Sequence, residues 1–448
     1  MRGFLASSIG VTCAAALALP LTPPAAAMTA GAAPSGARSA PVAAAAPQET
    51  SAEVLGSTQS LPLAPLTRDR ALGPVAPEQG LTRDDVRHFS LVGVIWDNPD
   101  TPLHGSVQVR TRATGSGAWT GWQDLETHND DAADPGTAER TSGRVRGSTA
   151  PLWVGDSDGV EVRVRAEGER RTDETARGTR TATAVTPLPS GLRLELVDPG
   201  EQPRTRAAVP PTALGATELP ALGRAATERE LLAVRGAELT EAQRARPYIG
   251  PRPRIITRRG WGADEKLREK KFVYTKKVKA AFVHHTASGN GYRCSQADSV
   301  IRGIYRYHVE SMGWRDIGYN FLVDKCGNIY EGRAGGVAKA VLGAHTLGFN
   351  SNSMGIAVIG TFGSSKPPAA VLKAIARLTA WKLGLYGANP RGKTYLKSGG
   401  GNLYRKGKNV RLNVISGHRD GFATECPGWQ LYRKLGTARS TAARYQGR

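Results

Sequence analysis

The sequence predicts two folded parts of different class: a small all-β, sandwich-like domain, and after it an α/β domain with a mixed central β-sheet flanked by helices. Between residues 85 and 198, apolar and polar residues alternate in several short runs, which is typical of half-buried strands. Gly, Pro and Asn separate these runs, as expected for the turns of an antiparallel sandwich. After residue 253, short apolar runs alternate with longer segments of helical period, which indicates an α/β arrangement.

The first 84 residues are expected to precede both folded parts. A positive start, an apolar run over residues 4–21 and small residues at 25–27 predict a secretory signal peptide over residues 1–27. The apolar run is short for a membrane span, so no transmembrane segment is expected. Residues 28–84 are rich in Ala, Pro and Ser, and we expect a disordered leader there.

The β-domain is expected over residues 85–198. Its strand signals are an apolar run over residues 89–96 and alternating runs around Val107, Val162 and Leu194. Two acidic stretches, at 128–135 and 156–159, invite comparison with calcium-binding loops. Neither stretch has the ligand spacing of such a loop, so we interpret both as ordinary turns.

The remaining segments are a linker, the α/β domain and a tail. Residues 199–252 return to Pro, Ala and Arg and are interpreted as a linker with one short helix near Leu231. The α/β domain is expected over residues 253–436, and residues 437–448 are expected to form a polar tail that frays. Within the domain we predict buried strands at 281–285 and 354–359, a hairpin around Gly327-Asn328, and helices after Ser295 and after Pro368.

Two short stretches of this domain contain residue types that bind zinc. His284 ends a predicted buried strand, and His418 and Cys426 lie eight residues apart in a Gly-rich loop. Catalytic zinc sites use three ligands from His, Cys and acidic residues and leave a fourth position for water. Spacing alone does not choose between His284 and His285, which point to opposite faces of a regular strand.

Several motifs of the α/β domain resemble one known family, and they occur in the same order along the chain. They are Val283-His284-His285-Thr286, Gly313-Trp314-Arg315-Asp316-Ile317-Gly318-Tyr319-Asn320-Phe321, Tyr330-Glu331-Gly332-Arg333, Gly343-Ala344-His345, Ser353-Met354-Gly355-Ile356, Gly417-His418-Arg419-Asp420 and Cys426-Pro427-Gly428. Together they resemble the peptidoglycan recognition proteins and the related zinc-dependent N-acetylmuramoyl-L-alanine amidases. The resemblance covers about residues 255–436.

The resemblance implies a zinc ion at the floor of a groove, with His284, His418 and Cys426 as its ligands. It also places the family's catalytic tyrosine at Tyr319. A second catalytic position falls on Thr424, where phage relatives carry lysine and animal recognition amidases carry threonine. Because threonine has no positive charge, the resemblance implies that stabilisation of the oxyanion depends more on zinc and on Tyr319.

Further residues are implied to bind the substrate. His308, His345 and Asn350 match positions that line the peptide groove in relatives, although packing is the alternative role for each. Arg333 is also expected to bind substrate, with a structural ion pair as its alternative role. The implied function is a secreted zinc hydrolase that cleaves the amide bond between N-acetylmuramic acid and L-Ala of peptidoglycan by zinc-activated water.

The alternative function is recognition of peptidoglycan without catalysis. Non-catalytic members of the family typically lack a zinc ligand, whereas all three ligand positions and Tyr319 are present here. The sequence therefore favours the enzyme. We expect a monomer that is extracellular or associated with the cell wall.

The cysteine count adds one more prediction. Cys13 would leave with the signal peptide, so Cys294, Cys326 and Cys426 remain in the exported chain. An odd number of cysteines in an exported protein is explained by one disulfide and one metal-bound thiolate, with a buried free thiol or a disulfide between chains as the alternatives. We therefore predict a disulfide between Cys294 and Cys326.

The chain is strongly basic, with a formal net charge of +21. Seven Lys and Arg residues fall within residues 266–279, beside a single Glu. Such a surface suits anionic polymers of a cell wall. No nucleic-acid-binding motif is present and the protein is expected to be exported, so we expect no nucleic-acid partner.

Overall fold

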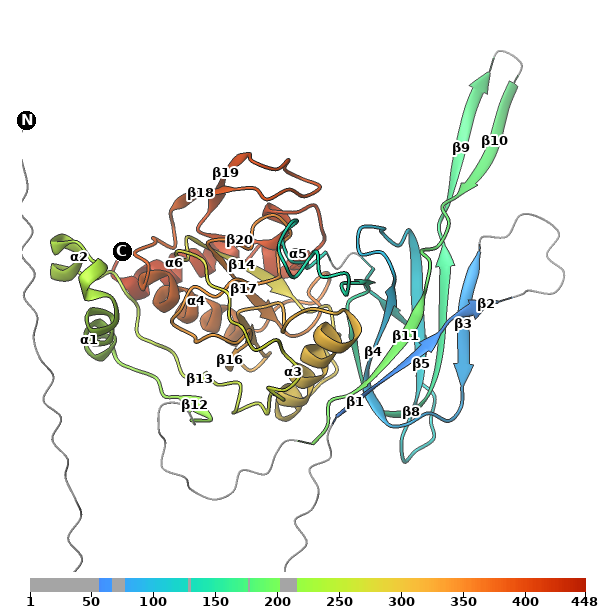
Figure 1. Cartoon of the computed structure of the whole chain (residues 1–448), viewed down its shortest axis with the longest axis horizontal. Coiled ribbons are helices and arrows are strands. Elements are labelled where there is room, and N and C mark those ends of the chain that lie inside the picture. Colours follow the sequence, from blue (N-terminus) through green and yellow to red (C-terminus); the bar gives the residue numbers. More distant parts are fainter. Residues whose placement is uncertain (1–55, 67–76, 128–129, 176–177, 202–215) are drawn as a thin grey trace, which may run out of the picture. The chain divides into compact units, whose positions relative to one another are not determined.

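The computed structural model describes residues 56–66, 77–127, 130–175, 178–201 and 216–448, and these belong to one compact unit. Figure 1 shows the chain coloured along its sequence, with the all-β part in blue and green and the α/β part running from yellow-green to red. The predicted signal peptide lies outside the described residues. Among the described residues, no helix has the length and hydrophobicity needed to cross a membrane.

The all-β part is one continuous sheet of nine strands that pair antiparallel. Its long strand β8 pairs with β4 through its first half and with β3 and β5 through its second half. Apolar side chains of β4, β5, β8 and β11 meet in one core, which confirms the alternating residues as inward-facing. A separate hairpin of β9 and β10 extends from β8 (Figure 1). The strands are β1 (Ser57–Pro62), β2 (Ala64–Pro65), β3 (Glu78–Arg83), β4 (Phe89–Trp96), β5 (Gly105–Ala113), β6 (Gln123–Leu125), β7 (Gly147–Ser148), β8 (Leu152–Ala166), β9 (Gly168–Thr175), β10 (Gly178–Val185) and β11 (Arg193–Asp198).

Strand β4 is buried on both faces, which explains why its sequence does not alternate. Val92 and Val94 face the core of the β-sheet. Leu91 and Ile95 instead join the apolar cluster of helix α3 (Ala297–Arg306) in the α/β part. Because both sides of one strand are covered, the two parts of the chain share a hydrophobic boundary.

The prediction of a disordered leader over residues 28–84 is wrong for its described portion. Strand β1 pairs with β11, and β3 pairs with β8. Both partners lie far along the chain, so the stability of β1 and β3 comes from pairing that local composition does not reveal. The all-β part therefore begins upstream of residue 85.

The α/β part is built on a seven-stranded sheet of order β12-β13-β16-β15-β17-β14-β20. Parallel and antiparallel pairs both occur, which confirms the predicted mixed sheet. Its strands are β12 (Glu218–Leu219), β13 (Ile255–Ile256), β14 (Ala280–His285), β15 (Phe321–Val323), β16 (Ile329–Glu331), β17 (Ser353–Val358) and β20 (Ile415–Gly417), and β18 (Lys393–Lys397) pairs separately with β19 (Asn409–Asn413). Its helices, besides α3, are α1 (Arg224–Arg235), α2 (Glu241–Ala245), α4 (Ala369–Gly384), α5 (Trp429–Tyr432) and α6 (Leu435–Gln446).

Alternate residues of the sheet belong to different apolar clusters. Val283 of β14 and Ile356 of β17 pack with residues of α4 and α6. Leu322 of β15 and Ala357 of β17 pack with residues of α3. Since successive side chains of a strand point to opposite faces, α4 and α3 lie against opposite faces of the sheet.

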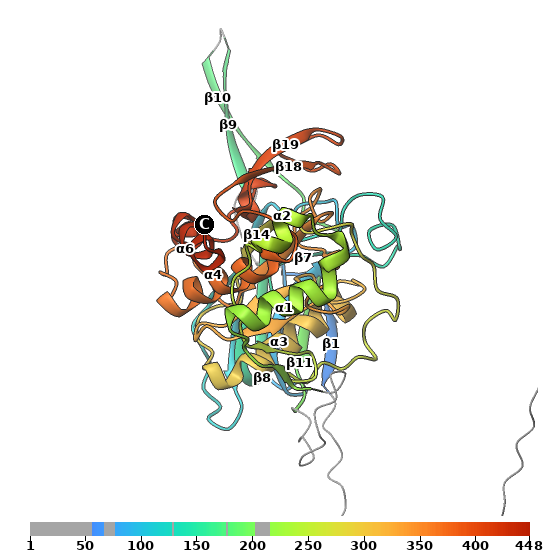
Figure 2. The same cartoon turned by 90° about the vertical axis from the view of Figure 1, so that its left-hand side faces the viewer.

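The linker interpretation of residues 199–252 is wrong from residue 216 onward. Strand β12 pairs with β13, and Leu231 of the predicted short helix is buried in the core of the α/β part. The Gly250 amide also donates to the Ala380 carbonyl of α4 at 3.1 Å. Figures 1 and 2 show α1 and α2 beside the C-terminal end of α6.

The interpretation of residues 437–448 as a fraying tail is also wrong. They continue helix α6, in which Ala438 and Ala442 are buried four residues apart. The Gln446 side chain donates to the Ala380 carbonyl of α4 at 3.0 Å. The apolar residues buried in this segment are alanines, so it looks polar by composition although it can pack closely against α4.

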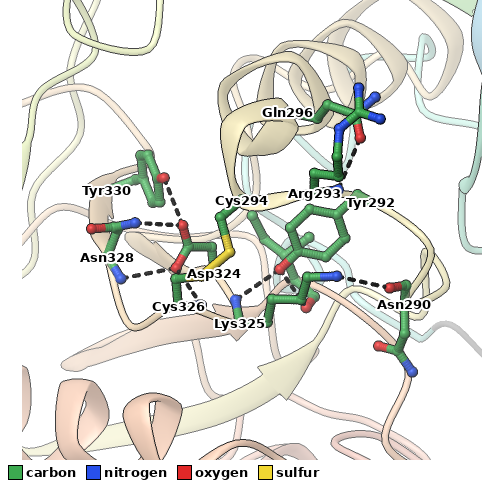
Figure 3. The surroundings of a disulfide bond; sticks show 11 residues. Asn290, Tyr292, Arg293, Cys294, Gln296, Asp324, Lys325, Cys326, Asn328 and Tyr330 are labelled. Atoms are coloured by element: carbon green, nitrogen blue, oxygen red, sulfur yellow. Dashed lines mark hydrogen bonds between the residues drawn. A yellow bond between two sulfur atoms is a disulfide. The ribbon is translucent and has the colours of Figure 1, made fainter.

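The predicted hairpin and disulfide are both present. Strands β15 and β16 pair antiparallel around a turn in which Gly327 has φ of 87°. Cys326 in this turn is bonded to Cys294, which lies just before α3 (Figure 3). The Asp324 carboxylate accepts hydrogen bonds from the Asn328 side chain at 2.7 Å and from the Tyr330 hydroxyl at 2.9 Å. The disulfide thus joins the start of α3 to this turn, and hydrogen bonds among the side chains of the turn already hold it in place.

Removal of this disulfide is expected to destabilise the protein. The bond closes a loop with a sequence separation of 32 residues. Loop-closure entropy gives a loss of about 3–4 kcal/mol for the double variant Cys294→Ser, Cys326→Ser. Urea unfolding measures it, with a Ser295→Ala variant as the control for a change in the same segment. A loss below about 1 kcal/mol would contradict the loop-entropy account.

Candidate metal centre

Strand β14 presents its two histidines to opposite faces of the sheet. His284 lies on the same face as Phe282, and its side chain is fully buried. The other side chain, His285, accepts a hydrogen bond at Nδ1 from the Phe362 amide at 3.3 Å. This arrangement gives the two histidines different roles, as the alternation of a regular strand requires.

The second stretch forms a tight loop directly after β20. The Asp420 carboxylate accepts a hydrogen bond from the Gly417 amide at 2.9 Å and another from the Tyr432 hydroxyl at 2.6 Å. The Arg419 amide donates to the Cys426 carbonyl at 3.1 Å, which brings the two ends of the loop together. Because β20 pairs in parallel with β14, the loop starts beside the end of the strand that carries His284.

The structure brings His284, His418 and Cys426 together. One ligand atom from each of them lies within 4.8 Å of the other two. Cys426 Sγ is 3.7 Å from His284 Nδ1. His284 Nε2 lies 3.3 Å from the Thr346 hydroxyl, a contact that holds the ring with Nδ1 toward the sulfur.

These residues fit a zinc ion. Both ring nitrogens of His418 are buried without a hydrogen-bond partner among the described residues. Burial lowers the pKa of His284 and of His418 to about 3, so both rings are neutral, which is the form that binds metals. Burial also raises the pKa of the Cys426 thiol well above its usual value, so a thiolate here needs a cation beside it. Two imidazoles and one thiolate are a donor set drawn from the residue types that bind catalytic zinc.

Tyr319, which the resemblance marks as the catalytic tyrosine, lies beside these residues. Its ring centroid is 5.6 Å from that of His284, and the side chain is buried. The hydroxyl donates a hydrogen bond of 2.5 Å to Asp131 Oδ2. Burial, together with this carboxylate, raises the pKa of Tyr319 well above its usual value, so the hydroxyl keeps its proton and remains a donor.

Asp131 is a residue that the sequence interpretation missed. It belongs to the acidic stretch whose local sequence predicts an ordinary turn, yet its side chain is fully buried at the metal centre. Its Oδ1 atom lies 3.0 Å from His284 Nδ1 and 3.4 Å from His418 Nδ1. Burial raises the pKa of Asp131 to about 6. No local pattern marks this residue, because its contacts are with side chains far along the chain.

The structure places the other predicted site residues, Thr424, His308 and His345, in three different environments. Thr424 accepts a hydrogen bond from the Cys426 amide at 3.3 Å and so supports the loop. His308 lies in a π-helical turn after α3, where Nδ1 accepts from the Gly318 amide at 3.2 Å and the ring packs at a tilt of 39° against Trp314, with 4.5 Å between centroids. The ring of His345 lies 5.2 Å from that of His284.

Asn350 and Arg333 are bound by acidic residues from the all-β part. Asn350 Nδ2 donates to Asp134 at 2.7 Å. Arg333 donates two hydrogen bonds, of 2.8 and 2.9 Å, to the carboxylate of Glu139. These two candidate substrate residues are therefore already paired within the chain.

Comparison with known proteins gives the family. A protein-family model described as "N-acetylmuramoyl-L-alanine amidase" matches residues 274–429. A second family model, described as "Rv3811 N-terminal galactose-binding domain-like", matches residues 43–187. Peptidoglycan-recognition protein SC2 of Drosophila simulans is 33% identical over 41% of this chain and 85% of its own length. Human N-acetylmuramoyl-L-alanine amidase is 31% identical over 45% of this chain and 30% of its own length.

Solved structures are similar in the same region. One is the peptidoglycan recognition protein LE in complex with tracheal cytotoxin, described as monomeric diaminopimelic acid-type peptidoglycan, which is 33% identical over 41% of this chain and 92% of its own, with a TM-score of 0.32. The SC2 relative is matched over most of its length, and the amidase model covers the residues that build the metal centre. The chain therefore belongs to the family of peptidoglycan recognition proteins and type 2 N-acetylmuramoyl-L-alanine amidases.

Proposed function

We propose that this protein is a secreted, zinc-dependent N-acetylmuramoyl-L-alanine amidase. It hydrolyses the amide bond between the lactyl group of N-acetylmuramic acid and L-Ala in peptidoglycan. The observation that carries the proposal is the buried set of His284, His418 and Cys426, whose ligand atoms lie within 4.8 Å of one another beside the hydroxyl-bearing ring of Tyr319.

Each residue of the centre has a task in this reaction. His284, His418 and Cys426 hold the zinc, and zinc bound there would activate water and polarise the scissile carbonyl. Thr346 fixes the ring orientation of His284 through its contact with Nε2. Tyr319 donates a hydrogen bond to the oxygen on which negative charge develops. Its proton stays in place at neutral pH, because burial raises its pKa.

The test measures zinc content and hydrolysis in the same protein. Release of L-Ala amino groups is followed on soluble muropeptides and on purified wall suspensions, before and after a chelator, and again after zinc is restored. Because Asp131 contacts the ligands, the assay is run on the native chain and on Asp131→Ala. Release that depends on zinc in either protein supports the amidase. Zinc and peptidoglycan bound by both proteins, with no release from either, would instead favour recognition without catalysis.

A further inference from the structure

The metal centre is closed to solvent. His284 and His418 are fully buried, and Cys426 is 4% exposed. A hydrolase that acts on a polymer needs its metal at an open groove. Asp131 lies directly against two of the ligands, and it belongs to a segment of the all-β part, residues 130–140, that we name the plug.

Asp131 of the plug meets the ligands as a ligand would. Its Oδ1 atom lies 3.0 Å from His284 Nδ1 and 3.4 Å from His418 Nδ1, yet this atom makes no hydrogen bond among the described residues. His418 Nδ1 likewise has no hydrogen-bond partner there. Buried polar atoms without partners are costly, so their approach to one another calls for a shared cation. Meanwhile Tyr319 holds the second oxygen of the same carboxylate at 2.5 Å.

Asp134 anchors the plug to the loop before β17. Its Oδ1 atom accepts hydrogen bonds from the Gly348 amide at 2.8 Å, from the Asn350 amide at 3.2 Å and from Asn350 Nδ2 at 2.7 Å. Asn350 Nδ2 also donates to the Ala132 carbonyl at 2.8 Å. The Asn350 side chain of the α/β part thus binds both the Asp134 side chain and the backbone of the plug.

Glu139 anchors the other end of the plug. Its carboxylate accepts both hydrogen bonds of the Arg333 fork and a third, of 3.2 Å, from the Arg315 amide. The Glu139 side chain is 3% exposed and that of Arg333 is 5% exposed. This bidentate pair is buried and has a specific geometry. It therefore fixes the position of the plug over the metal centre.

The plug is also tied to the body of the all-β part. Arg140 pairs with Asp100 in the loop after β4. At the hydrophobic boundary between the two parts of the chain, the Tyr307 hydroxyl donates to the carbonyls of Val94 and Thr149, at 3.3 and 3.2 Å. A cavity of about 310 Å³ borders Asp131 and is lined by both parts of the chain. The plug faces this cavity on one side. Its withdrawal therefore loses fewer van der Waals contacts than removal of a segment that is packed on all sides.

We propose that Asp131 is a fourth protein ligand of the metal, and that the plug holds the enzyme in a latent state. The proposal rests on the proposed zinc function. Four protein ligands make a closed site of the structural kind, whereas catalysis needs an open position for water. Withdrawal of the plug frees that position, and it releases Asn350 and Arg333 for substrate in the same movement.

The experiment compares the native full-length chain with Asp131→Ala and with a matched control, Asp124→Asn. Asp124 is also in the all-β part, but its carboxylate accepts a hydrogen bond from Gln108 at the surface. Each protein is loaded with cobalt in place of zinc, and its visible spectrum is recorded with and without acetohydroxamic acid, a small ligand that takes open metal positions. Zinc affinity is measured by competition with a chelator, and muropeptide hydrolysis is measured on the zinc forms.

The native chain and the control are expected to give cobalt spectra that acetohydroxamic acid does not change. Asp131→Ala is expected to give a spectrum that shifts on addition of this ligand, and a zinc affinity lower by about 10- to 100-fold. Its hydrolysis is expected to rise about 10- to 100-fold, as for a protein whose competent state is a minority of roughly 1–10%. A native spectrum that already shifts with acetohydroxamic acid would overturn the proposal and leave the zinc site intact. Failure of all three proteins to bind metal would instead overturn the proposed function.

A second variant provides a test of the proposal if Asp131→Ala does not fold. Gly93 lies in β4, and a methyl group placed there would come within 2.4 Å of the Tyr307 hydroxyl. Gly93→Ala therefore weakens the boundary that seats the plug without touching the metal centre. Its cobalt spectrum is expected to become sensitive to acetohydroxamic acid, as in Asp131→Ala. A Gly93→Ala protein that folds and whose spectrum does not respond counts against the coupling between the boundary and the plug.

Discussion

Full-length Cys426→Ser is expected to lose its bound zinc and, with it, all measurable hydrolysis. The substitution removes the single thiolate of the centre, and a neutral hydroxyl cannot replace it as a ligand. Cys426 is one of the three ligands that remain when the plug withdraws, so its loss should cost more zinc affinity than the factor of about 10 to 100 expected for Asp131→Ala. Zinc content after dialysis against a weak chelator measures the result.

Stability gives an independent measure of the same change. Zinc at about 100 times its dissociation constant raises the free energy of unfolding of the native chain by about 2.7 kcal/mol. In Cys426→Ser this zinc-dependent stabilisation should disappear. The double variant Cys294→Ser, Cys326→Ser is the control, because it removes the two cysteines of the disulfide and leaves Cys426 in place. Retention of one zinc per chain by Cys426→Ser would exclude Cys426 as a ligand.

Elements with a strong local pattern could be predicted from the sequence. The apolar run that became β14, the helix after Pro368 and the Gly327 hairpin all appear where periodicity and turn residues place them. Cys294 and Cys326 were paired correctly because the cysteine count left few alternatives. For the strand, the helix and the hairpin, the sequence signal lies within a few neighbouring residues. For the disulfide, only a small number of cysteine pairings was possible.

Elements that depend on distant partners could not be predicted in this way. Strand β1 looks like leader sequence because its partner β11 lies more than a hundred residues along the chain. Helix α6 looks like a tail because its buried face consists largely of alanines that need α4 to cover them. Asp131 is the most important case for function. Only the fold brings the acidic stretch against β14, and an acidic turn at the surface has the same local sequence.

The Arg333–Glu139 pair is expected to give the largest effect on stability of any ion pair in the plug. Both side chains are almost fully buried and joined by two hydrogen bonds. Arg333→Met leaves the Glu139 carboxylate buried without its partner, which typically costs about 3–5 kcal/mol. Urea unfolding of the full-length chain measures the change. The double variant Arg333→Met, Glu139→Met should recover most of the loss, because two apolar side chains of similar length can replace a buried pair with little change in stability.

The double-mutant cycle separates two explanations for a loss of stability. If the pair forms in solution as in the structure, the coupling energy between Arg333 and Glu139 is large, and the double variant is more stable than either single variant. The surface pair Arg144–Glu269, in which both side chains are more than a third exposed, is the control and should show a coupling below about 1 kcal/mol. Additive losses in the Arg333–Glu139 cycle would mean that the plug is not seated on Arg333 in the native protein. A large coupling would show that the plug is seated on Arg333 in solution, by a measurement that involves neither metal nor substrate.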